Sequence, residues 1–230
     1  MEKKILKKPK ISYEVLPSTA FKDLFVSSKT LVPGWYKQIP QYEMPNEKRT
    51  AKLCVPFLES FLSGYMIVLP YDIYVKNIDG SPFLFWANEM PNTPSFRDSP
   101  GDVNLVPAGH FPKEFVWRTN VAWTVPKGYS ALFTHPLNRH DLPFTTLSAV
   151  IDGGLAVSPV NNVPFYVKVG FEGLIPQGTP IAQIIPFRQE NWKSEKKDGL
   201  NDLALSHNNL AMSVFKGWYK KTFWVKKEYN

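Results

Sequence analysis

The alternation of apolar and polar positions along the 230 residues predicts a chain built mostly of short β-strands. Residues 65–77 (YMIVLPYDIYVKN) are rich in β-branched and aromatic side chains and alternate locally between apolar and polar positions. The next four residues, IDGS at 78–81, are a hairpin signal, and the apolar run FLFWA follows at 83–87. We therefore expect two paired strands in this part of the chain.

Strand-like segments also fill much of the second half of the chain, each bounded by Pro or Gly. Short strands at this spacing indicate a barrel or a sandwich. Before them, residues 88–114 contain five prolines and two glycines and are interpreted as a long loop, of a length that is often functional or interface-forming. The segments expected to be strands of one compact β structure are 121–134, 146–151, 164–171 and 181–187.

The same pattern divides the chain into three parts. Residues 1–50 are rich in Pro, Lys and aromatic residues and are interpreted as an irregular wrapping extension, followed by a β-rich core domain at 51–190. Residues 191–230 are interpreted as one helix and a basic aromatic arm. The helix is predicted within 198–217 from its apolar positions, with Gly217 as a candidate C-cap.

Composition favours a mostly β chain over a helical bundle, because 21 prolines and 14% aromatic residues are typical of short strands joined by Pro-marked turns. The formal net charge of +7 is distributed unevenly. Residues 1–10 contribute +4 and residues 186–230 another +4, which leaves −1 for residues 11–185. The basic character therefore lies at the two ends and not on a central groove.

Basic and large aromatic side chains are concentrated in residues 1–40 and 216–230, which points to docking arms that cover a partner subunit. Two other interpretations stay open. In the first, both ends fold back and complete their own β core. In the second, which we do not favour, the lysines at 220–227, interleaved with aromatic residues, form a nucleic-acid surface. The residues expected in the interface arms are Trp35, Tyr36, Trp218, Tyr219, Phe223 and Trp224.

Three residues inside apolar runs are expected to be buried: Trp86, Trp117 and the single cysteine, Cys54. One cysteine excludes an internal disulfide framework and suits a reducing compartment. The basic start MEKKILKKPK is followed by no continuous apolar stretch, so we expect neither an export signal nor a membrane span.

The order and spacing of motifs over residues 121–187 resemble the dUTPase and dCTP deaminase superfamily. WTVPKGYSALF is similar to the strand and turn before that family's phosphate-binding motif, LSAVIDGG to its substrate-pocket hairpin, and IPQGTPIAQIIPF to its closing strand. In the last motif Gly178 permits a tight turn, and the apolar residues after it alternate as a core strand requires. The resemblance implies a single β-clip, dUTPase-like barrel-sandwich, and such domains commonly form trimers.

The resemblance carries over only part of the family's chemistry. Asp152 stands where the family's aspartate positions the attacking water, but Leu155 stands where its tyrosine packs on the substrate sugar. Arg139 is the one residue that could serve as the phosphate-gripping arginine, and no serine is adjacent. Because one arginine is too few for a triphosphate clamp, we expect no dUTP hydrolysis.

The first half of the chain is similar to a family of proteins from tailed bacteriophages and some bacteria whose activity is not established. The runs that carry this resemblance are PGWYKQIP at 33–40 and KLCVPFLESFLSGYMIVLPYDIYV at 52–75. It implies a phage-related source.

A metal site would need three or more ligands converging on one point. His135, His140 and Asp141 lie close together in HPLNRHD, and His110 precedes them. Close spacing in a Pro-containing loop does not guarantee that these side chains converge on one point. We expect no metal and no cofactor. A general-base pair of His140 and Asp141 is disfavoured because adjacent side chains in an extended strand point to opposite faces.

The sequence favours a non-catalytic structural or interaction protein in which a β-clip core and terminal arms bind partner subunits. The expected partners are further copies of the chain, with a trimer as the first guess, or phage structural proteins, in the host-cell cytoplasm or in the virion. The alternative is a diverged nucleotide-binding enzyme of the dUTPase and dCTP deaminase superfamily. In that case Asp152, Arg139 and His140 would line the nucleotide pocket.

Overall fold

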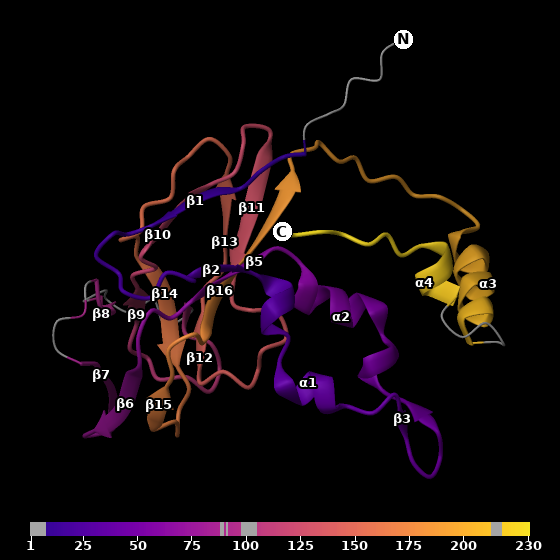
Figure 1. Ribbon diagram of the computed structural model, residues 1–230. Helices are drawn as coiled ribbons and strands as arrows, with labels where there is room; N and C mark the ends of the chain where they lie inside the picture. The colour runs from indigo at the N-terminus through magenta and orange to yellow at the C-terminus, as the bar shows by residue number, and fades with distance from the viewer. Residues whose placement is uncertain (1–7, 88–89, 91, 98–104, 213–217) are drawn as a thin grey trace.

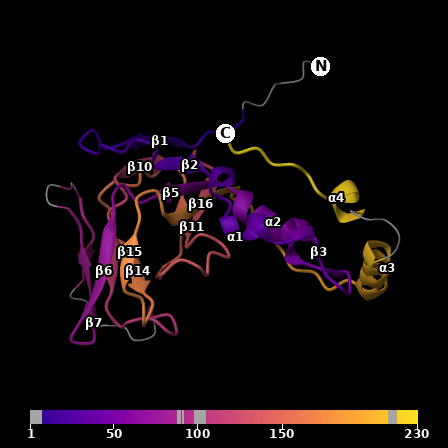
Figure 2. The same ribbon diagram turned by 60° about the horizontal axis from the view of Figure 1, so that its bottom comes forward.

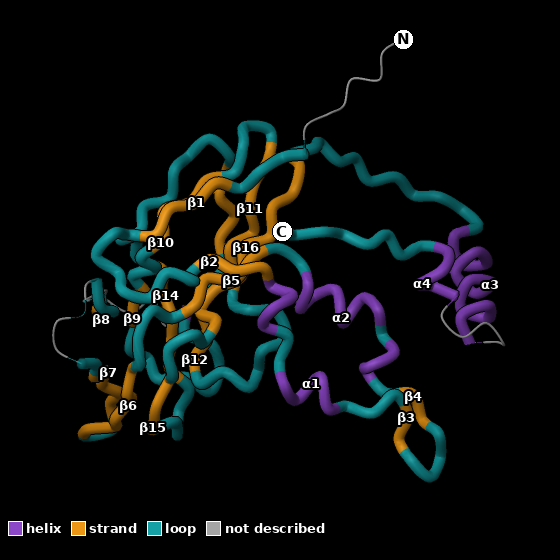
Figure 3. Tube along the Cα trace, in the orientation of Figure 1, coloured by secondary structure: helices purple, strands orange, loops and turns teal. Residues whose placement is uncertain are grey.

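Figure 1 shows the computed structural model. It describes residues 8–87, 90, 92–97, 105–212 and 218–230. Antiparallel strands make up most of the regular structure, with few helices, so the mostly β fold is confirmed (Figure 3). No helix among the described residues is long and apolar enough to cross a membrane.

The larger part of the fold consists of a five-stranded sheet of order β13-β11-β16-β5-β2 and a four-stranded sheet of order β12-β14-β9-β8. A three-stranded sheet, β15-β6-β7, and the two-stranded pairs β1-β10 and β3-β4 complete it. The strands are β1 (Ser12–Val15), β2 (Phe25–Ser27), β3 (Tyr42–Glu43), β4 (Lys48–Arg49), β5 (Tyr65–Val68), β6 (Ile73–Ile78), β7 (Ser81–Phe85), β8 (Ser95–Phe96), β9 (Phe115–Trp117), β10 (Val121–Thr124), β11 (Tyr129–Thr134), β12 (Phe144–Thr146), β13 (Ala149–Asp152), β14 (Val163–Val167), β15 (Gly173–Ile175) and β16 (Pro180–Arg188).

One hydrophobic core is built from both larger sheets. Trp117 is 1% exposed and stacks on Phe165 with ring centroids 3.5 Å apart, and Phe144 meets both rings edge-on. The predicted burial of Trp117 is therefore confirmed, whereas Trp86 is half-buried and packs against the edge of the core. All four segments predicted as strands in the second half contain strands.

The predicted hairpin is present, but the block before it contains two strands. β5 ends at Val68 and β6 begins at Ile73, with Pro70 between them. β6 pairs with β7 through a turn in which Asp79 and Gly80 both have positive φ, as a two-residue hairpin turn requires.

The interpretation of residues 1–50 as irregular needs correction. β1 pairs with β10, and β2 pairs with β5 at the end of the five-stranded sheet, so this segment supplies strands to the β structure. Residues 33–40 contain the short helix α1 (Gly34–Gln38), which follows the 3₁₀ turn η1 (Ser28–Leu31). Backbone pairing over a long sequence separation is not visible in the local pattern of residues, so these strands cannot be predicted from that pattern.

Helix α2 (Val55–Leu62) was not predicted, because its apolar sequence VPFLESFL fits a buried strand as well as a helix. It follows the 3₁₀ turn η2 (Ala51–Leu53) and has a proline in its first turn, where a missing backbone N–H costs nothing. Cys54, at the N-cap, is exposed, so its predicted burial is wrong.

The C-terminal part contains two helices where one was predicted, α3 (Leu200–Met212) and α4 (Trp218–Thr222). Both lie apart from the sheets in Figures 1 and 2, joined to the core by extended segments. The proposed C-cap at residue 217 lies outside the described residues, as do residues 88–89, 91 and 98–104 of the predicted long loop. The described part of that loop includes strand β8.

Candidate functional site

Asp152 is the last residue of β13, opposite Ser130 of β11, so it lies at a strand end, as the resemblance of LSAVIDGG to a hairpin motif implies. Ser130 Oγ and Gln189 Nε2 both donate to Asp152 Oδ1, at 2.7 and 3.0 Å. The chain turns immediately afterwards at Gly153, where an added Cβ would lie 2.1 Å from the Pro126 carbonyl oxygen. Asp152 is thus an exposed carboxylate held by neutral donors at a tight turn.

Leu155, at the position of the family's tyrosine, is 63% exposed. It offers an aliphatic side chain where the enzyme family presents an aromatic ring. No stacking platform for a sugar therefore forms at this position.

Arg139 is engaged by a carboxylate. Its Nε donates to Asp141 Oδ1 at 2.9 Å and its Nη2 donates to Oδ2 at 2.9 Å, so the contact is bidentate. The Arg139 side chain is 11% exposed. Trp35 Nε1 donates to Asp141 Oδ1 at 3.2 Å. Partial burial raises the pKa of the Asp141 carboxyl, but the hydrogen bonds and charge of Arg139 outweigh it and hold that pKa below its usual value. Arg139 is therefore already neutralised.

His135 is a satisfied interior histidine. Its Nδ1 accepts from the Thr146 backbone N–H at 3.3 Å, so its Nε2 carries the proton and donates to the Arg139 carbonyl oxygen at 3.2 Å. Burial lowers the pKa of His135 to about 4, and the nearby charge of Lys168 acts in the same direction. His135 is neutral at physiological pH.

The structure does not bring the three residues proposed for a nucleotide pocket together. Asp152 lies opposite the start of β11, whereas Arg139 and His140 follow its other end, beyond Thr134. The four residue steps from Ser130 to Thr134 alone span roughly 13 Å. Within one chain, the length of strand β11 therefore separates Asp152 from Arg139 and His140.

No group of three His, Cys, Asp or Glu side chains that could hold a metal ion occurs within the part of the chain that the structure describes. The candidate ligands instead have separate partners. His110 Nε2 lies 2.9 Å from Thr145 Oγ1, and the backbone carbonyl of exposed His140 accepts from Lys168 Nζ at 2.5 Å.

The N-terminal pair of proposed interface residues packs within its own chain. Tyr36 is 2% exposed, with its ring centroid 5.0 Å from that of Phe61 on α2, and the Trp35 ring lies 5.8 Å from Phe61. This is the arrangement left open as the alternative to arms that cover a partner. Tyr36 is therefore buried within its own chain, whereas Trp35 remains 38% exposed and its predicted place in an interface stays a prediction.

The C-terminal aromatic residues form a small cluster between α3 and α4. The Trp218 ring lies 5.1 Å from Phe223 and 5.5 Å from His207 of α3, while Tyr219 and Phe223 stay 42% and 48% exposed. Trp224 is half-buried, with Lys220 Nζ 5.6 Å from its ring centroid.

The last six residues, 225–230, run back along the molecule as a C-terminal strap. Ser27 Oγ donates to the Tyr229 carbonyl oxygen at 2.6 Å, and Tyr65 OH donates to the Asn230 carbonyl oxygen at 3.3 Å. Lys227 Nζ lies 2.7 Å from Glu59 Oε2 on α2. The strap thus ties the α3–α4 segment to strands β2 and β5.

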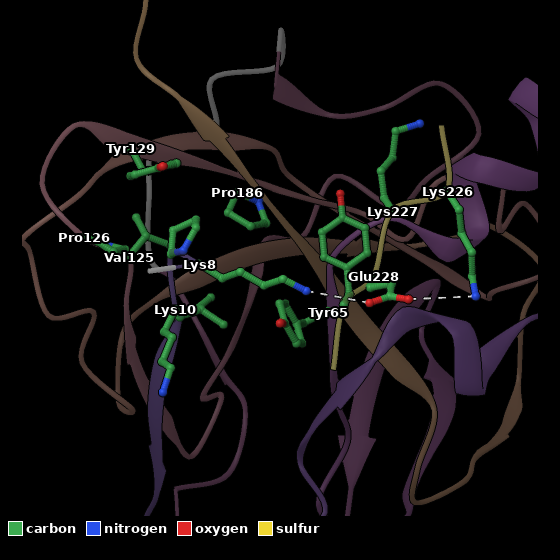
Figure 4. A pocket seen from close by; sticks show the side chains of 13 residues that line it. Lys8, Lys10, Tyr65, Val125, Pro126, Tyr129, Pro186, Lys226, Lys227 and Glu228 are labelled. Carbon is green, nitrogen blue, oxygen red and sulfur yellow. Dashed lines mark ion pairs between the residues drawn. The ribbon is translucent and has the colours of Figure 1, made fainter. Parts of the chain in front are cut away.

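The strap and the N-terminal segment meet over the five-stranded sheet and enclose a cleft (Figure 4). Its volume is about 430 Å³, within the range of small-ligand and peptide sites. Its walls come from both ends of the chain and its floor from the sheet region. The lining residues are Lys8, Pro9, Lys10, Ile11, Tyr65, Val125, Pro126, Tyr129, Pro186, Lys226, Lys227, Glu228 and Tyr229.

The rim of this cleft is cationic. Glu228 lies between two exposed lysines, with Lys8 Nζ at 3.8 Å and Lys226 Nζ at 3.9 Å from its carboxylate oxygens (Figure 4). Lys10 forms no ion pair with any described residue. The hydrogen bond and charge of Glu59 raise the pKa of Lys227, which turns away toward α2. An anion entering the cleft would meet lysines from both ends of the chain.

The floor is aromatic and apolar. Partial burial raises the pKa of Tyr65, so its hydroxyl stays protonated and donates to the strap, and its ring meets Tyr229 edge-on at 6.0 Å. Pro126, Pro186 and Tyr129 continue the floor. Lysines above aromatic and proline side chains suit a ligand with carboxylate or phosphate groups on an apolar or planar body.

Sequence reasoning missed this cleft because its walls lie at opposite ends of the chain. A signal was nevertheless present: two basic ends, residues 1–10 and 186–230, flank a middle with a net charge of −1. The basic composition suggests that each end binds anions, but it does not indicate that the two ends lie side by side in the folded chain.

No protein-family model matches the sequence, and no curated protein matches it. Among solved structures, the chain is similar to a mutant dUTPase from phage phi11 of S. aureus, a structure described as revealing the coordination of a structural Mg(II) ion. The two chains are 13% identical and superpose with a TM-score of 0.33, over 82% of this chain and 97% of the other. A similarity at this level carries no argument about function.

Proposed function

We propose that this protein is a non-catalytic interaction protein that holds an acidic segment of a partner protein in the cleft between its two ends. The observation that carries the proposal is the convergence of lysines from both ends over a floor of tyrosine and proline side chains. The β-clip classification, the phage origin and the place in a virion or host-cell cytoplasm belong to the same proposal and rest on the sequence resemblances.

The engagement of the candidate catalytic residues supports a binding role over a catalytic one. Arg139 is neutralised by Asp141, and Asp152 is a strand length away from it. A phosphoryl-transfer site needs several donors converging on one developing charge, which these residues do not provide. The nucleotide-binding enzyme therefore has less support than the interaction protein.

The chemistry of the cleft favours an extended acidic peptide. Glu228 already places a carboxylate between Lys8 and Lys226 through long, exposed contacts, so a carboxylate of a partner that displaced Glu228 would meet the same two lysines. Proline and tyrosine side chains on the floor suit an extended backbone, since aromatic-lined grooves bind such segments with little loss of conformational entropy.

The proposal is tested by fluorescence anisotropy with a labelled peptide of alternating Glu, Pro and Tyr residues and the full chain. We expect binding that weakens with salt, since the contacts are exposed charges. Lys10→Glu and Lys226→Glu should each reduce affinity about fivefold or more, as expected for exposed charge pairs. Lys193→Glu, an exposed lysine outside the cleft, is the matched control and should leave affinity unchanged.

Two outcomes would count against this function. Peptide binding that is absent, or equal in all four proteins, removes the cleft as the binding site. Release of pyrophosphate from dUTP that disappears in Asp152→Asn would instead favour the nucleotide enzyme.

The C-terminal strap should contribute measurably to stability. Deleting residues 225–230 removes the hydrogen bonds to Ser27 and Tyr65 and the ion pair with Glu59, so we expect the free energy of unfolding to fall by about 2 kcal/mol. Urea unfolding followed by tryptophan fluorescence measures it, and Ser27→Ala should show about half of the loss. Unchanged stability after the deletion would leave the strap without a packing role.

A further inference from the structure

The outer face of the three-stranded sheet carries several large apolar side chains. Along β6 the buried residues Ile73 and Val75 alternate with exposed Tyr74 and Lys76, and Asp72, just before the strand, continues the exposed series. Tyr74, Lys76 and Asp72 therefore point to the same outer face.

A row of large apolar side chains crosses this face. Tyr74 is paired with Phe85 on one side and Leu174 on the other, and the three are 44%, 48% and 55% exposed. Phe83, opposite Lys76, is 40% exposed. A contiguous apolar patch of this kind on a sheet is typical of a protein-protein contact.

One ring of the patch is held in place by a cation. Lys113 Nζ lies 3.9 Å from the centroid of the Phe83 ring and donates to the Pro82 carbonyl oxygen at 3.1 Å. The carboxylate of Asp72 is likewise fixed, because its Oδ1 accepts from the Gln177 backbone N–H at 2.7 Å. Ordered side chains lose little entropy when a partner covers them.

We propose that a second copy of this chain covers this face, with the two-fold axis lying along the row Leu174–Tyr74–Phe85. Asp72 and Lys76 lie two positions before and after Tyr74 on the same face. Rotation about that axis makes the two β6 strands antiparallel, so Asp72 meets the partner's Lys76 and Lys76 meets the partner's Asp72. Each apolar residue of the row then meets its own counterpart.

The amount of apolar surface fits this partner. Each partly exposed ring of the patch leaves roughly 100 Å² in water, so the patch with its charged flanks supplies several hundred Å² on each copy. A standard interface buries about 800 Å² per partner, with an apolar centre and a polar rim. The patch has this anatomy, and its charges are self-complementary.

This inference does not depend on the proposed peptide cleft. The two surfaces share no lining residue, and β6 and β7 lie on the opposite side of the molecule from the C-terminal strap in both Figures 1 and 2. Loss of dimerisation with intact peptide binding, or the reverse, would therefore distinguish the two proposals.

Sedimentation velocity of the full chain tests the pairing, with a dimer expected at twice the chain mass of 26.3 kDa. Asp72→Lys and Lys76→Asp should each weaken dimerisation about tenfold. Each change turns both Asp72–Lys76 contacts of the dimer into contacts between like charges. The double variant should return to within about threefold of the unchanged protein. Glu14→Lys, exposed on β1 of another sheet, is the matched control.

Tyr74→Lys supplies a second test that does not involve the Asp72 hydrogen bond. Its exposed position leaves the fold intact, as circular dichroism should show, while two lysines at the axis should leave the chain monomeric. A monomer at every concentration, a trimer, or a dimer that both single charge changes leave intact would overturn the proposal. Failure of the double variant to recover would also overturn it, since recovery follows only from the two-fold pairing.

Discussion

A Gly64→Ala variant is expected to lose about 2 to 5 kcal/mol of its free energy of unfolding. Gly64 joins α2 to β5 with φ of +72°, a left-handed conformation that costs other residues energy. An added Cβ would also lie 2.0 Å from the Ile184 carbonyl oxygen and 2.9 Å from the Ile184 carbonyl carbon. Because both atoms belong to the backbone of β16, no side-chain rotation relieves the clash, and the central strands of the five-stranded sheet must separate.

Gly80→Ala separates the two causes of this loss. Gly80 has nearly the same φ, +76°, but no atom lies within 4 Å of its added Cβ. It should therefore cost only about 1 to 2 kcal/mol, the conformational part. Urea unfolding of the two variants measures the difference, and equal losses would show that the approach of Gly64 to β16 is unimportant.

Local sequence predicted those parts of the fold that local chemistry determines. The turn at Asp79 and Gly80 needs two residues with positive φ, and these residue types adopt it readily, so the β6–β7 hairpin was predictable. The tight turn at Gly178, with φ of +81°, was predictable for the same reason.

Other parts depend on partners far away in the chain. Helix α2 has only eight residues and would be marginal alone, and it is stabilised by packing of Phe57 and Phe61 against Tyr36. The pairing of Ser12–Val15 with β10 likewise joins segments about a hundred positions apart. Neither is recoverable from the alternation of apolar and polar residues.

The candidate site shows the same division. The strand-end position of Asp152 was implied by the resemblance of LSAVIDGG to a hairpin motif, but the engagement of Arg139 by Asp141 depends on the fold of the loop that carries them. The cleft needed both ends of the chain to converge on Tyr65 and Tyr129. Residue types can therefore identify candidate groups, whereas their assembly is a property of the folded chain.

The free energy of unfolding should fall by about 3 kcal/mol as the pH drops from 6.5 to 4, through the protonation of His135. Burial holds the folded pKa of His135 at about 4, below its ordinary value of 6.5. The unfolded chain therefore binds a proton that the folded chain excludes. This stability is fully present above pH 6.5 and is lost progressively as the pH falls toward the folded pKa.

The surroundings of His135 explain why the folded protein cannot simply accept the proton. Nδ1 already accepts from the Thr146 N–H, so a proton there would face another donor, and the nearby charges of Lys168 and Arg139 oppose a third cation. The Phe144 ring, 5.9 Å away and edge-on, helps to exclude water.

His135→Gln tests this account, because its amide oxygen can still accept from Thr146 and the side chain cannot ionise. Urea unfolding at pH 7 and pH 4 should show a smaller fall for this variant than for the unchanged protein, by about 3 kcal/mol. Carboxylates such as Asp141 titrate in the same window in both proteins, so only the difference between the two falls reports on His135. His207→Gln, on α3 away from this loop, is the matched control and should follow the unchanged protein. If His135→Gln and His207→Gln lose stability equally on acidification, His135 is not the buried group that excludes a proton from the folded chain.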